Sequence, residues 1–456
     1  NPIILDDSER HLKSQNHSAW RPNPAQNELA TIDSRSHEQQ SLQHHAPHRS
    51  SMLKALTFGN SKANPHEAED TPNPPQLYFS KSALLNNREP QPLFFDPHHL
   101  AEDSAPVDKN GGIWGSNGWL VPLDDLSADY NVGDLLPAMA GGLSHDGTLY
   151  AAPFYGESSM VMYRTDLMAK AGLEMPAAPS WNFIAKAARA MTDRSNDING
   201  ICLRGKAGWG EGGAFITAMS NSFGARWFDE DWNAQFDTRE WSDTLNFFVN
   251  MMSDAGPAGF ATNGFNENLS LFQQGKCGMW IDATVAASFV TNPNDSTVAD
   301  SVGFALAPDN GMGVRSNWLW AWALAIPAGT QKEAAAKQFI EWATSNSYIE
   351  LVAANEGWAN VPPGARTSLY ENPNYKDIPF AKMTLDSILS ADPLNSTVDP
   401  SPYVGIQFAA IPEFAGIATD VSQEFSAAYA GQQSIEDALA KAQAITNDAM
   451  EAAGYR

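Results

Sequence analysis

Short apolar segments alternate with amphipathic helical segments from Ile113 to Arg456, and this alternation is the strongest constraint on the fold of the chain. "SWNFIAKAARAM" predicts a helix that starts after the capping residue Ser180, with apolar residues at 183, 184, 187, 188 and 191. "VGFALAP" predicts a strand, and "NLSLFQQGKCGMWIDA" predicts a helix, a turn and a strand. Such alternation is typical of α/β proteins, so we expect parallel sheets covered by helices.

Capping and chain-breaking residues place the ends of other elements. "WSDTLNFFVNMMSDAGP" predicts a helix that stops at Gly256. "SIEDALAKAQAITNDAMEAAG" carries Ser434 and Asp437 at the spacing of a capping box. "HDGTLYAAPF" predicts a turn at Asp146-Gly147, followed by a strand.

The segment before Ile113 has a different composition. Residues 1–112 are rich in Ser, Asn, Gln, Pro and His, and they hold every histidine except His145. Their apolar residues show little periodicity, which by itself predicts a disordered or linker-like segment. His-His pairs occur at 44–45 and 98–99 without a third ligand at convincing spacing, so we predict no metal site.

Composition limits the possible partners. The 456 residues suffice for two or three domains of about 100–200 residues each. The net charge of -25, from 28 Lys+Arg and 53 Asp+Glu, repels phosphate backbones, so we expect no nucleic-acid partner. No apolar run is long enough to span a membrane. The two cysteines, Cys202 and Cys277, are compatible with one disulfide or with two buried thiols.

The segment "NWLWAWALAIPAG" places three tryptophans two residues apart, at Trp318, Trp320 and Trp322. On a strand these side chains share one face, and the opposite face carries Leu319, Ala321 and Ala323. The face is either packed entirely in a core or divided between a core and a cleft. Three adjacent indoles are hard to pack against one helix, and each N–H needs a partner, which favours the second alternative.

Two carboxylates stand near strand ends. Glu157 follows Tyr155-Gly156 in "PFYGESSMVMYRTDL", and it is either a solvated edge charge or an acceptor for ligand hydroxyls. Asp282 follows the apolar stretch Met279–Ile281. It either caps the next helix or receives a polyhydroxylated ligand.

A glycine-rich stretch, "CLRGKAGWGEGGAF", carries Arg204, Lys206 and Trp209. It lacks both common phosphate-binding glycine motifs, so we predict no nucleotide cofactor. The glycines either let these side chains project into a cleft or form an exposed basic loop. Guanidinium donors, carboxylates and indole faces together match carbohydrate recognition, because buried sugar hydroxyls need hydrogen-bond partners. No nucleophile with a matching base is visible in the sequence, so we predict no enzyme activity.

Six segments after Ile113 resemble the extracellular solute-binding proteins of ABC importers: "GWLVPLDDL", "LYAAPFYGESSMVMYRTDLMAKAGL", "GICLRGKAGWGE", "SLFQQGKCGMWIDATVAASFV", "NWLWAWALAIPAG" and "VGIQFAAIPEF". More narrowly, they resemble the sorbitol/mannitol (polyol) branch of the sugar-binding family. The resemblance runs continuously from Ile113 to Arg456.

The resemblance implies a type II periplasmic-binding-protein fold, in which a multi-strand hinge joins two α/β lobes with a ligand cleft between them. It implies one lobe from 113–155 with 322–362, and a second from 156–321 with 363–456. The implied crossings are Phe154–Ser158, Trp318–Trp322 and Val361–Arg366. Residues 1–112 stand where the first half of the first lobe is expected, but they lack its pattern of strands and helix.

The resemblance also implies a set of ligand-binding residues: Tyr155, Glu157, Arg204, Trp209, Asp282, Trp318, Trp320 and, as weaker candidates, Arg366 and Tyr403. Trp322 is expected deeper in the core of the first lobe. Alanine at Trp318 or Asp282 should weaken ligand binding at least tenfold. Cys202 and Cys277 both fall in the second lobe, and we predict that they lie close together.

The function implied is a monomeric, non-enzymatic receptor in the periplasm. It captures a polyol or small sugar by closure of the lobes and delivers it to the transmembrane subunits of an ABC permease. Its signal peptide is expected to be absent from this chain. The alternatives are a carbohydrate-active enzyme that uses Glu157 and Asp282 as a carboxylate pair, and a surface adhesin.

Overall fold

The computed structural model describes residues 93–95, 115 and 117–456. Every described residue belongs to one compact unit, 79–456. The predictions for the composition-biased segment, including its two His-His pairs, therefore lie outside the described residues, apart from the short strand β1 (Leu93–Phe95).

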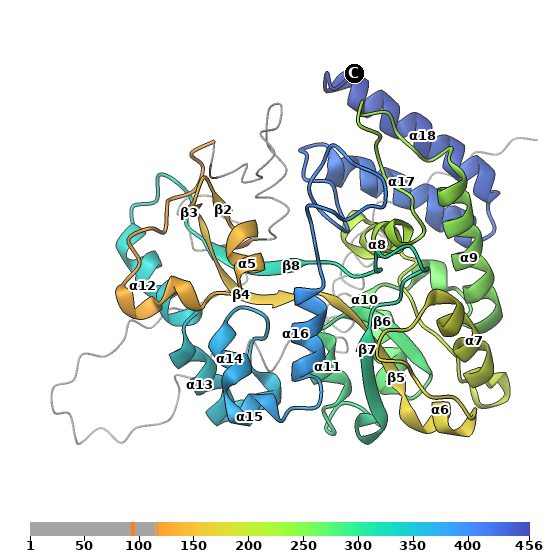
Figure 1. Cartoon of the computed structure of the whole chain (residues 1–456), viewed down its shortest axis with the longest axis horizontal. Coiled ribbons are helices and arrows are strands. Elements are labelled where there is room, and N and C mark those ends of the chain that lie inside the picture. The colour runs from red at the N-terminus through yellow and green to blue at the C-terminus, as the bar shows by residue number, and fades with distance from the viewer. Residues whose placement is uncertain (1–92, 96–114, 116) are drawn as a thin grey trace, which may run out of the picture. The chain divides into compact units, whose positions relative to one another are not determined.

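Two three-stranded sheets organise the described chain (Figure 1). The first has the order β1-β8-β4, with β8 at Trp320–Ala325 and β4 at Ala151–Glu157. The second has the order β6-β5-β7, formed by Met279–Ala283, Ser159–Arg164 and Val302–Leu306. Only Ser158 separates β4 from β5, so one nearly continuous segment passes from the first sheet into the second.

The expectation of parallel sheets is wrong for the named strands, because every ladder between them is antiparallel. The reason is β5, which runs opposite to both of its neighbours and so leaves β6 and β7 pointing the same way. Parallel pairing survives beside β6, where Asn199 bridges Cys277 and Cys202 bridges Trp280. The helices between these segments make the crossovers that the sequence pattern predicted.

A two-residue turn joins β2 (Ser144–His145) to β3 (Thr148–Leu149). Its central residues, Asp146 and Gly147, have φ values of 49° and 80°. Both lie in the left-handed region that a tight hairpin requires, and Asp and Gly tolerate it. The predicted turn is therefore confirmed.

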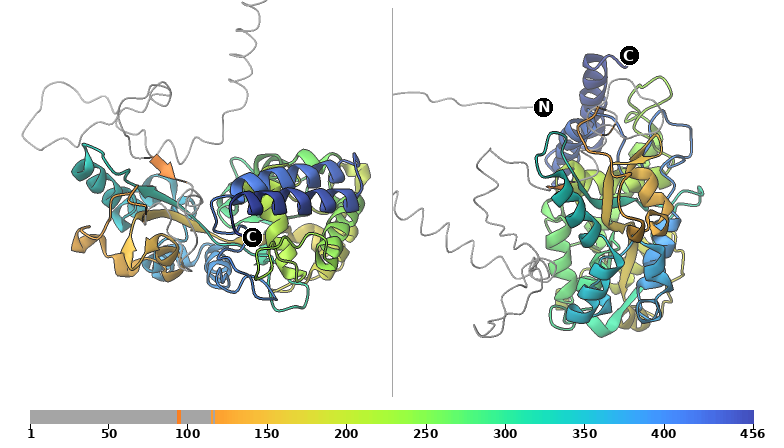
Figure 2. Two further views of the ribbon diagram at one scale, coloured as in Figure 1. Left: turned by 90° about the horizontal axis from the view of Figure 1, so that it is seen from above. Right: turned by 90° about the vertical axis from the view of Figure 1, so that its left-hand side faces the viewer.

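The helices follow the predicted caps. Ser180 accepts a hydrogen bond from the Phe183 amide (3.2 Å), Ser434 accepts one from the Asp437 amide (3.0 Å), and α9 ends at Gly256. The helices in chain order are α5 (Pro137–Gly142), α6 (Thr165–Lys170), α7 (Trp181–Met191), α8 (Ala214–Ser222), α9 (Arg239–Ala255), α10 (Phe265–Gln273), α11 (Ala286–Val290), α12 (Glu333–Ala343), α13 (Asn346–Glu356), α14 (Thr367–Glu371), α15 (Pro373–Lys376), α16 (Ala381–Leu389), α17 (Phe414–Tyr429) and α18 (Ile435–Ala452). The last two pack side by side (Figure 2).

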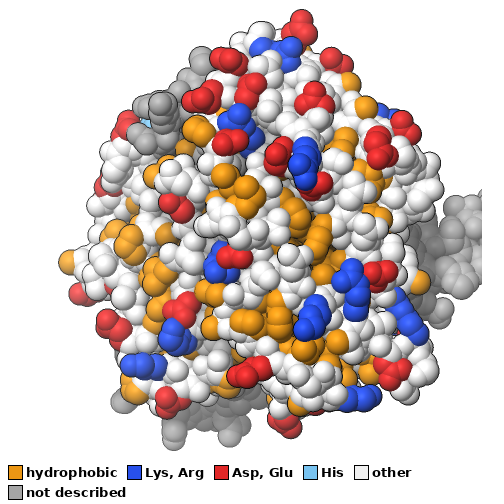
Figure 3. All heavy atoms as spheres, turned by 45° about the vertical axis from the view of Figure 1, so that its right-hand side comes forward, with side chains coloured by type: hydrophobic (Ala, Val, Ile, Leu, Met, Phe, Trp, Pro, Cys, Tyr) orange, Lys and Arg blue, Asp and Glu red, His pale blue; other side chains and the backbone are white. Residues whose placement is uncertain are grey.

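Short helical turns complete the described chain. Six are 3-10 turns: Ala128–Tyr130, Val132–Asp134, Arg194–Asn196, Phe260–Thr262, Ala299–Ser301 and Trp358–Asn360. A π-helical turn at Trp209–Gly213 leads into α8. No described helix combines the length and the hydropathy needed to cross a bilayer. On the face drawn in Figure 3, acidic and basic side chains are interspersed.

The two faces of β8 belong to different hydrophobic cores. The indoles of Trp318, Trp320 and Trp322 pack with a large core built on α7, α8, α9, α17 and α18. The alternate residues, Leu319, Ala321 and Ala323, face the opposite way. They pack in a smaller core that includes Met139, Ile340 and Ile388. The predicted alternation is confirmed, although the strand itself begins only at Trp320.

The expectation that Trp322 lies deep in the core of the first lobe is wrong. Its side chain is half-buried, whereas Trp318 and Trp320 are 5% and 8% exposed. The period of two along a strand explains the error, because it holds Trp322 on the face of the other two indoles, away from the smaller core.

Cys202 and Cys277 form a disulfide, with their Cα atoms 6.0 Å apart. Both are fully buried. The prediction that they lie close together is confirmed. The bond joins the parallel pair of segments beside β6, five residues before Asp282 and two before Arg204.

Candidate ligand-binding site

The parallel pairing beside β6 brings Arg204 to Asp282. The bridges Asn199–Cys277 and Cys202–Trp280 have the same sequence offset as Arg204 and Asp282, which is 78 residues. The next pair on the same side of the sheet is therefore Arg204 with Asp282. Their side chains form a bidentate ion pair, with Nε–Oδ2 at 2.8 Å and Nη2–Oδ1 at 2.5 Å.

The remaining contacts of Arg204 come from the glycine-rich stretch and from aromatic rings. Its Nη1 donates to the Gly210 carbonyl at 2.9 Å and lies 3.4 Å from Glu211 Oε2. The guanidinium carbon lies 5.3 Å from the Phe265 ring centroid and 5.6 Å from that of Trp318, within cation–π range. The side chain is 11% exposed, so the alternative of an exposed basic loop is wrong for Arg204.

Asp282 is fully buried and accepts hydrogen bonds from several donors. Besides the two from Arg204, it accepts one from the Trp280 indole (3.0 Å) and one from the Ala283 amide (2.7 Å). It does not cap the following helix, because α11 starts at Ala286 and its N-cap is Val285. The capping alternative is therefore wrong. Burial lowers the pKa of Arg204, but the charge and hydrogen bonds of Asp282, together with the charges of Glu211 and Glu157, hold this pKa above its ordinary value.

Glu157 ends β4 as a buried carboxylate, 8% exposed, which excludes the solvated edge charge. Its Oε2 is buried without a hydrogen-bond partner among the described residues. Burial raises the pKa of Glu157 to about 8. The charge of Arg204 lowers this pKa, that of Asp282 raises it, and a hydrogen bond from the Trp322 indole lowers it. Glu157 is therefore near enough to Arg204 and Asp282 for their charges to act on its pKa.

A row of four rings connects β4 to the glycine-rich stretch. Tyr155 stacks on Trp322 with centroids 6.1 Å apart, Trp322 contacts Trp320 at 6.1 Å, and Trp320 contacts Trp209 at 6.1 Å. We call these four residues the aromatic row. Because Tyr155 and Trp322 are opposite one another in the β4–β8 ladder, the strand register produces the start of this row.

Two residues near the site were missed from the sequence. Glu211 contacts Arg204 and also accepts the first amide of α10, at Phe265 (3.0 Å). The Gln407 side chain exchanges hydrogen bonds with both the amide and the carbonyl of Leu319 (3.3 and 2.9 Å), which holds the segment between Trp318 and Trp320 in place. Glu211 and Gln407 lie within the segments that carried the family resemblance, but no spacing rule singled them out.

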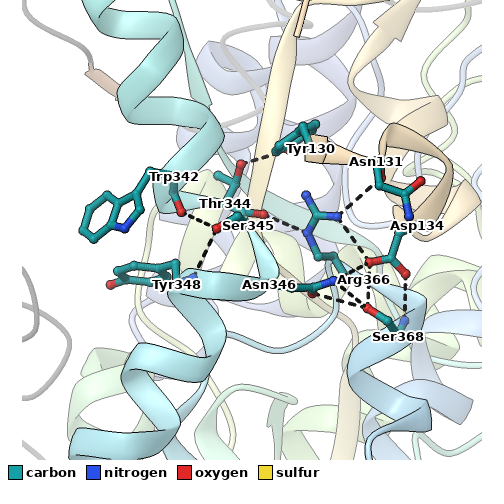
Figure 4. Close-up of polar contacts among 10 residues, drawn as sticks. All are labelled: Tyr130, Asn131, Asp134, Trp342, Thr344, Ser345, Asn346, Tyr348, Arg366 and Ser368. Atoms are coloured by element: carbon teal, nitrogen blue, oxygen red, sulfur yellow. Dashed lines mark hydrogen bonds and ion pairs between the residues drawn. The ribbon is translucent and has the colours of Figure 1, made fainter. Parts of the chain in front are cut away.

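Arg366 lies in a different network (Figure 4). It is 1% exposed and pairs with Asp134 (3.2 Å), and its Nε donates to the Thr344 carbonyl (2.8 Å). Asp134 also accepts from the amide (2.8 Å) and the hydroxyl (2.7 Å) of Ser368. The Tyr130 ring lies 4.6 Å from the guanidinium carbon. The structure does not bring Arg366 into contact with the Arg204–Asp282 pair.

Tyr403 is also separate from this site. It is 6% exposed, its hydroxyl accepts a hydrogen bond from the Trp227 amide (3.2 Å), and its ring packs against Phe228. Burial raises the pKa of Tyr403 to about 12. These contacts make it part of the large core.

Comparison with known proteins identifies the family. Residues 105–350 match the family model of the bacterial extracellular solute-binding proteins. The chain belongs to this family. The solute-binding protein is 51% identical over 343 residues to the mannitol-binding protein of Pseudomonas aeruginosa. The match covers 75% of this chain and 79% of that relative.

Solved structures agree with the family. A solute-binding protein from Agrobacterium vitis S4, with bound D-mannitol, is 66% identical, with a TM-score of 0.74; the match covers 75% of this chain and 83% of that chain. A ribitol complex from Agrobacterium radiobacter K84 is 22% identical, with a TM-score of 0.64, and covers 74% and 81%. The latter shows the fold alone.

The family and these structures confirm the predicted fold class. The chain has the type II fold of periplasmic sugar-binding proteins. It is a solute-binding protein rather than an enzyme. The carboxylate-pair alternative also fails on geometry, because Asp282 is fully engaged with Arg204, Trp280 and Ala283.

Proposed function

We propose that this solute-binding protein is the receptor of an ABC importer for a polyol, with D-mannitol as the first candidate. The observation that carries the proposal is the 66% identity with a solute-binding protein that holds D-mannitol. The mannitol-binding protein of P. aeruginosa, at 51% identity, supports the same ligand class.

The chemistry of the site supports a polyhydroxylated ligand. Glu157 supplies a buried oxygen without a partner among the described residues, which suits a ligand hydroxyl because an unpaired buried acceptor is costly. The aromatic row and Trp318 supply faces for the C–H groups of a polyol. We propose that the ligand contacts are Tyr155, Glu157, Arg204, Trp209, Trp318 and Trp320. Arg366 is left out because it pairs with Asp134 and Thr344, and Tyr403 because its hydroxyl accepts from the Trp227 amide.

We propose that the ligand is held by closure of two lobes, 113–155 with 322–362 and 156–321 with 363–456. One boundary changes: the end of the third crossing, at Arg366, and Ser368 after it move to the first lobe. Arg366 and Ser368 bond to Asp134, which supports placing this stretch in the first lobe. The crossing packs closely on β4 at Gly156 and Gly364. Gly364 has a φ of +74°, and a Cβ there would lie 2.0 Å from the Gly156 carbonyl oxygen, so the contact requires glycine.

The test is ligand screening of the purified protein. D-Mannitol, sorbitol, arabitol, xylitol, ribitol, maltose and trehalose are compared by thermal shift, and the hits are measured by calorimetry. A tight ligand in excess raises stability by RT ln(1 + [L]/Kd), which is about 2.7 kcal/mol at a hundredfold excess over Kd. No binding of any polyol, with binding of a disaccharide, overturns the polyol assignment.

The partners and the location belong to the same proposal. The family is extracellular, and we propose that this member works in the periplasm as a monomer that docks its closed form on the transmembrane permease subunits. Size-exclusion chromatography with light scattering tests the monomer. Polyol-dependent stimulation of the reconstituted importer tests the docking, and the absence of stimulation by the mannitol-loaded protein overturns it.

A further inference from the structure

We infer that Asp282 is a positioning residue that acts on the ligand only through Arg204. This inference rests on the proposed polyol function, and it changes the role of a residue that the sequence predicted to touch the ligand. It concerns how the site is built rather than which polyol enters it.

The hydrogen bonds of Asp282 support this role. Oδ1 accepts from Arg204 Nη2 and the Ala283 amide, and Oδ2 accepts from Arg204 Nε and the Trp280 indole. Two carboxylate oxygens offer about four acceptor positions in total, and these four donors fill them. Asp282 is also fully buried. A ligand hydroxyl would have to displace a protein donor to reach it.

The donors of Arg204 show what Asp282 achieves. A guanidinium has five N–H groups. The Nε hydrogen and one Nη2 hydrogen are bound by Asp282, and Nη1 faces the Gly210 carbonyl and Glu211. One Nη2 hydrogen remains without a partner among the described residues. The bidentate grip therefore fixes the plane of the guanidinium and decides which N–H is available to a ligand.

Charge supports the same role. Arg204 lies beside one fully buried carboxylate and is in ion-pair range of Glu211. These two acidic groups offset its positive charge, so the site suits an uncharged polyol rather than an anion. Removing the charge of Asp282 while keeping Arg204 would leave the cation less compensated and shift the preference toward anionic ligands.

A double-mutant cycle tests the inference. D-Mannitol affinity is measured by calorimetry for the wild type, R204Q, D282N and R204Q/D282N. We expect R204Q to weaken binding at least tenfold and D282N to weaken it at least fivefold. In the R204Q background, D282N should change Kd by no more than threefold, because its route to the ligand is already lost. A further loss greater than threefold there, or unchanged binding by D282N alone, overturns the inference.

The second measurement separates positioning from general structural damage. The ratio of the Kd values for D-mannonate and D-mannitol should fall at least tenfold in D282N, because a freed guanidinium favours the carboxylate of mannonate. Damage to the fold alone would weaken both ligands equally and leave the ratio unchanged, and that result overturns the inference. W280F is the matched control, since it removes one donor to Asp282 without changing any charge, so its ratio should stay at the wild-type value.

Folding and function are kept distinct by two comparisons. Thermal melts without ligand identify variants that do not fold. Should R204Q or D282N fail to fold, R204M, D282S and R204M/D282S supply the same comparison, because they also remove the cation and the carboxylate. Wild-type protein that binds no polyol contradicts the proposed function, whereas the inference about Asp282 is contradicted only by the differences among variants.

Discussion

The described residues include two buried arginine–aspartate pairs, and these pairs differ in what surrounds them. Tyr130, Thr344 and Ser368 enclose the pair of Arg366 with Asp134 (Figure 4). The Arg366 side chain is 1% exposed. Arg204 with Asp282 is 11% exposed on the arginine side. The guanidinium lies among aromatic rings. The charge of Arg204 also acts on Glu157, whose buried Oε2 has no partner among the described residues.

The comparison separates a structural ion pair from a binding one. The donors of Arg366 go to Asp134, to the carbonyl of the nearby Asn131 and to the carbonyl of Thr344, so the pair ties distant segments together. Its Nη2 is buried without a partner among the described residues. Arg204 is bound by Asp282 and by residues of the glycine-rich stretch, and one of its Nη2 hydrogens has no partner among the described residues.

The largest expected effect belongs to the structural pair. R366M should lower the free energy of unfolding by about 3–5 kcal/mol, because it leaves Asp134 buried without its counter-charge. Chemical denaturation measures this loss. D134N/R366M is the matched control and should recover part of the stability.

The same variant also tests the division between the two pairs. The Kd of folded R366M for D-mannitol should stay within about twofold of the wild type. A tenfold weaker Kd with little loss of stability would return Arg366 to the ligand contacts that the sequence predicted.

The disulfide distinguishes the second pair, because it joins the segments that carry Arg204 and Asp282. C202A/C277A should lose about 2–4 kcal/mol of stability, as is typical for removal of a disulfide. Denaturation with and without a reducing agent measures it for both proteins. With reducing agent, the wild type should have the same free energy of unfolding as the variant. Equal free energies of unfolding for the two proteins without reducing agent would contradict the prediction.

Glu157 should make the second pair sensitive to pH. Its pKa of about 8 lies above the ordinary 4.5, so between these values the folded protein binds more protons than the unfolded chain. Stability should therefore fall as the pH rises from about 4.5 to about 8, by at most about 1.4 kcal/mol per unit, and level off above.

E157Q should lack this contribution. Urea midpoints from pH 5 to pH 9 for wild type and E157Q measure the difference between the two proteins. Parallel curves would show that Glu157 does not titrate in this range.

The smallest effect is expected at a single indole. W318A should weaken D-mannitol binding at least tenfold, or about 1.4 kcal/mol, because it removes an apolar face beside Arg204. Calorimetry measures it. W342A is the matched control, since Trp342 is 42% exposed and lies near the Arg366 network (Figure 4). Equal losses in both variants would argue against a specific role for Trp318.

Local pattern was sufficient for several parts of the fold. The caps at Ser180 and Ser434 and the turn at Asp146-Gly147 are decided by side chains and backbone preferences within a few residues. The alternating faces of β8 follow from strand geometry alone. The sequence also predicted the residue types of a polyol site, since Glu157, Arg204 and Trp318 stand near strand ends and glycines.

Tertiary structure decided the direction of β5, the position of Trp322 and the separation of the two arginines. Each of these depends on which distant segment lies alongside, and a period along the chain carries no such information. By itself, the sequence determined the family, the helix and strand positions and the pool of candidate side chains. Only the fold decided that Asp282 is filled by four donors while Glu157 keeps an unpaired oxygen. Hydrogen-bond capacity is satisfied in three dimensions, and Arg204, which supplies two of the four donors, is 78 residues away from Asp282 in the sequence.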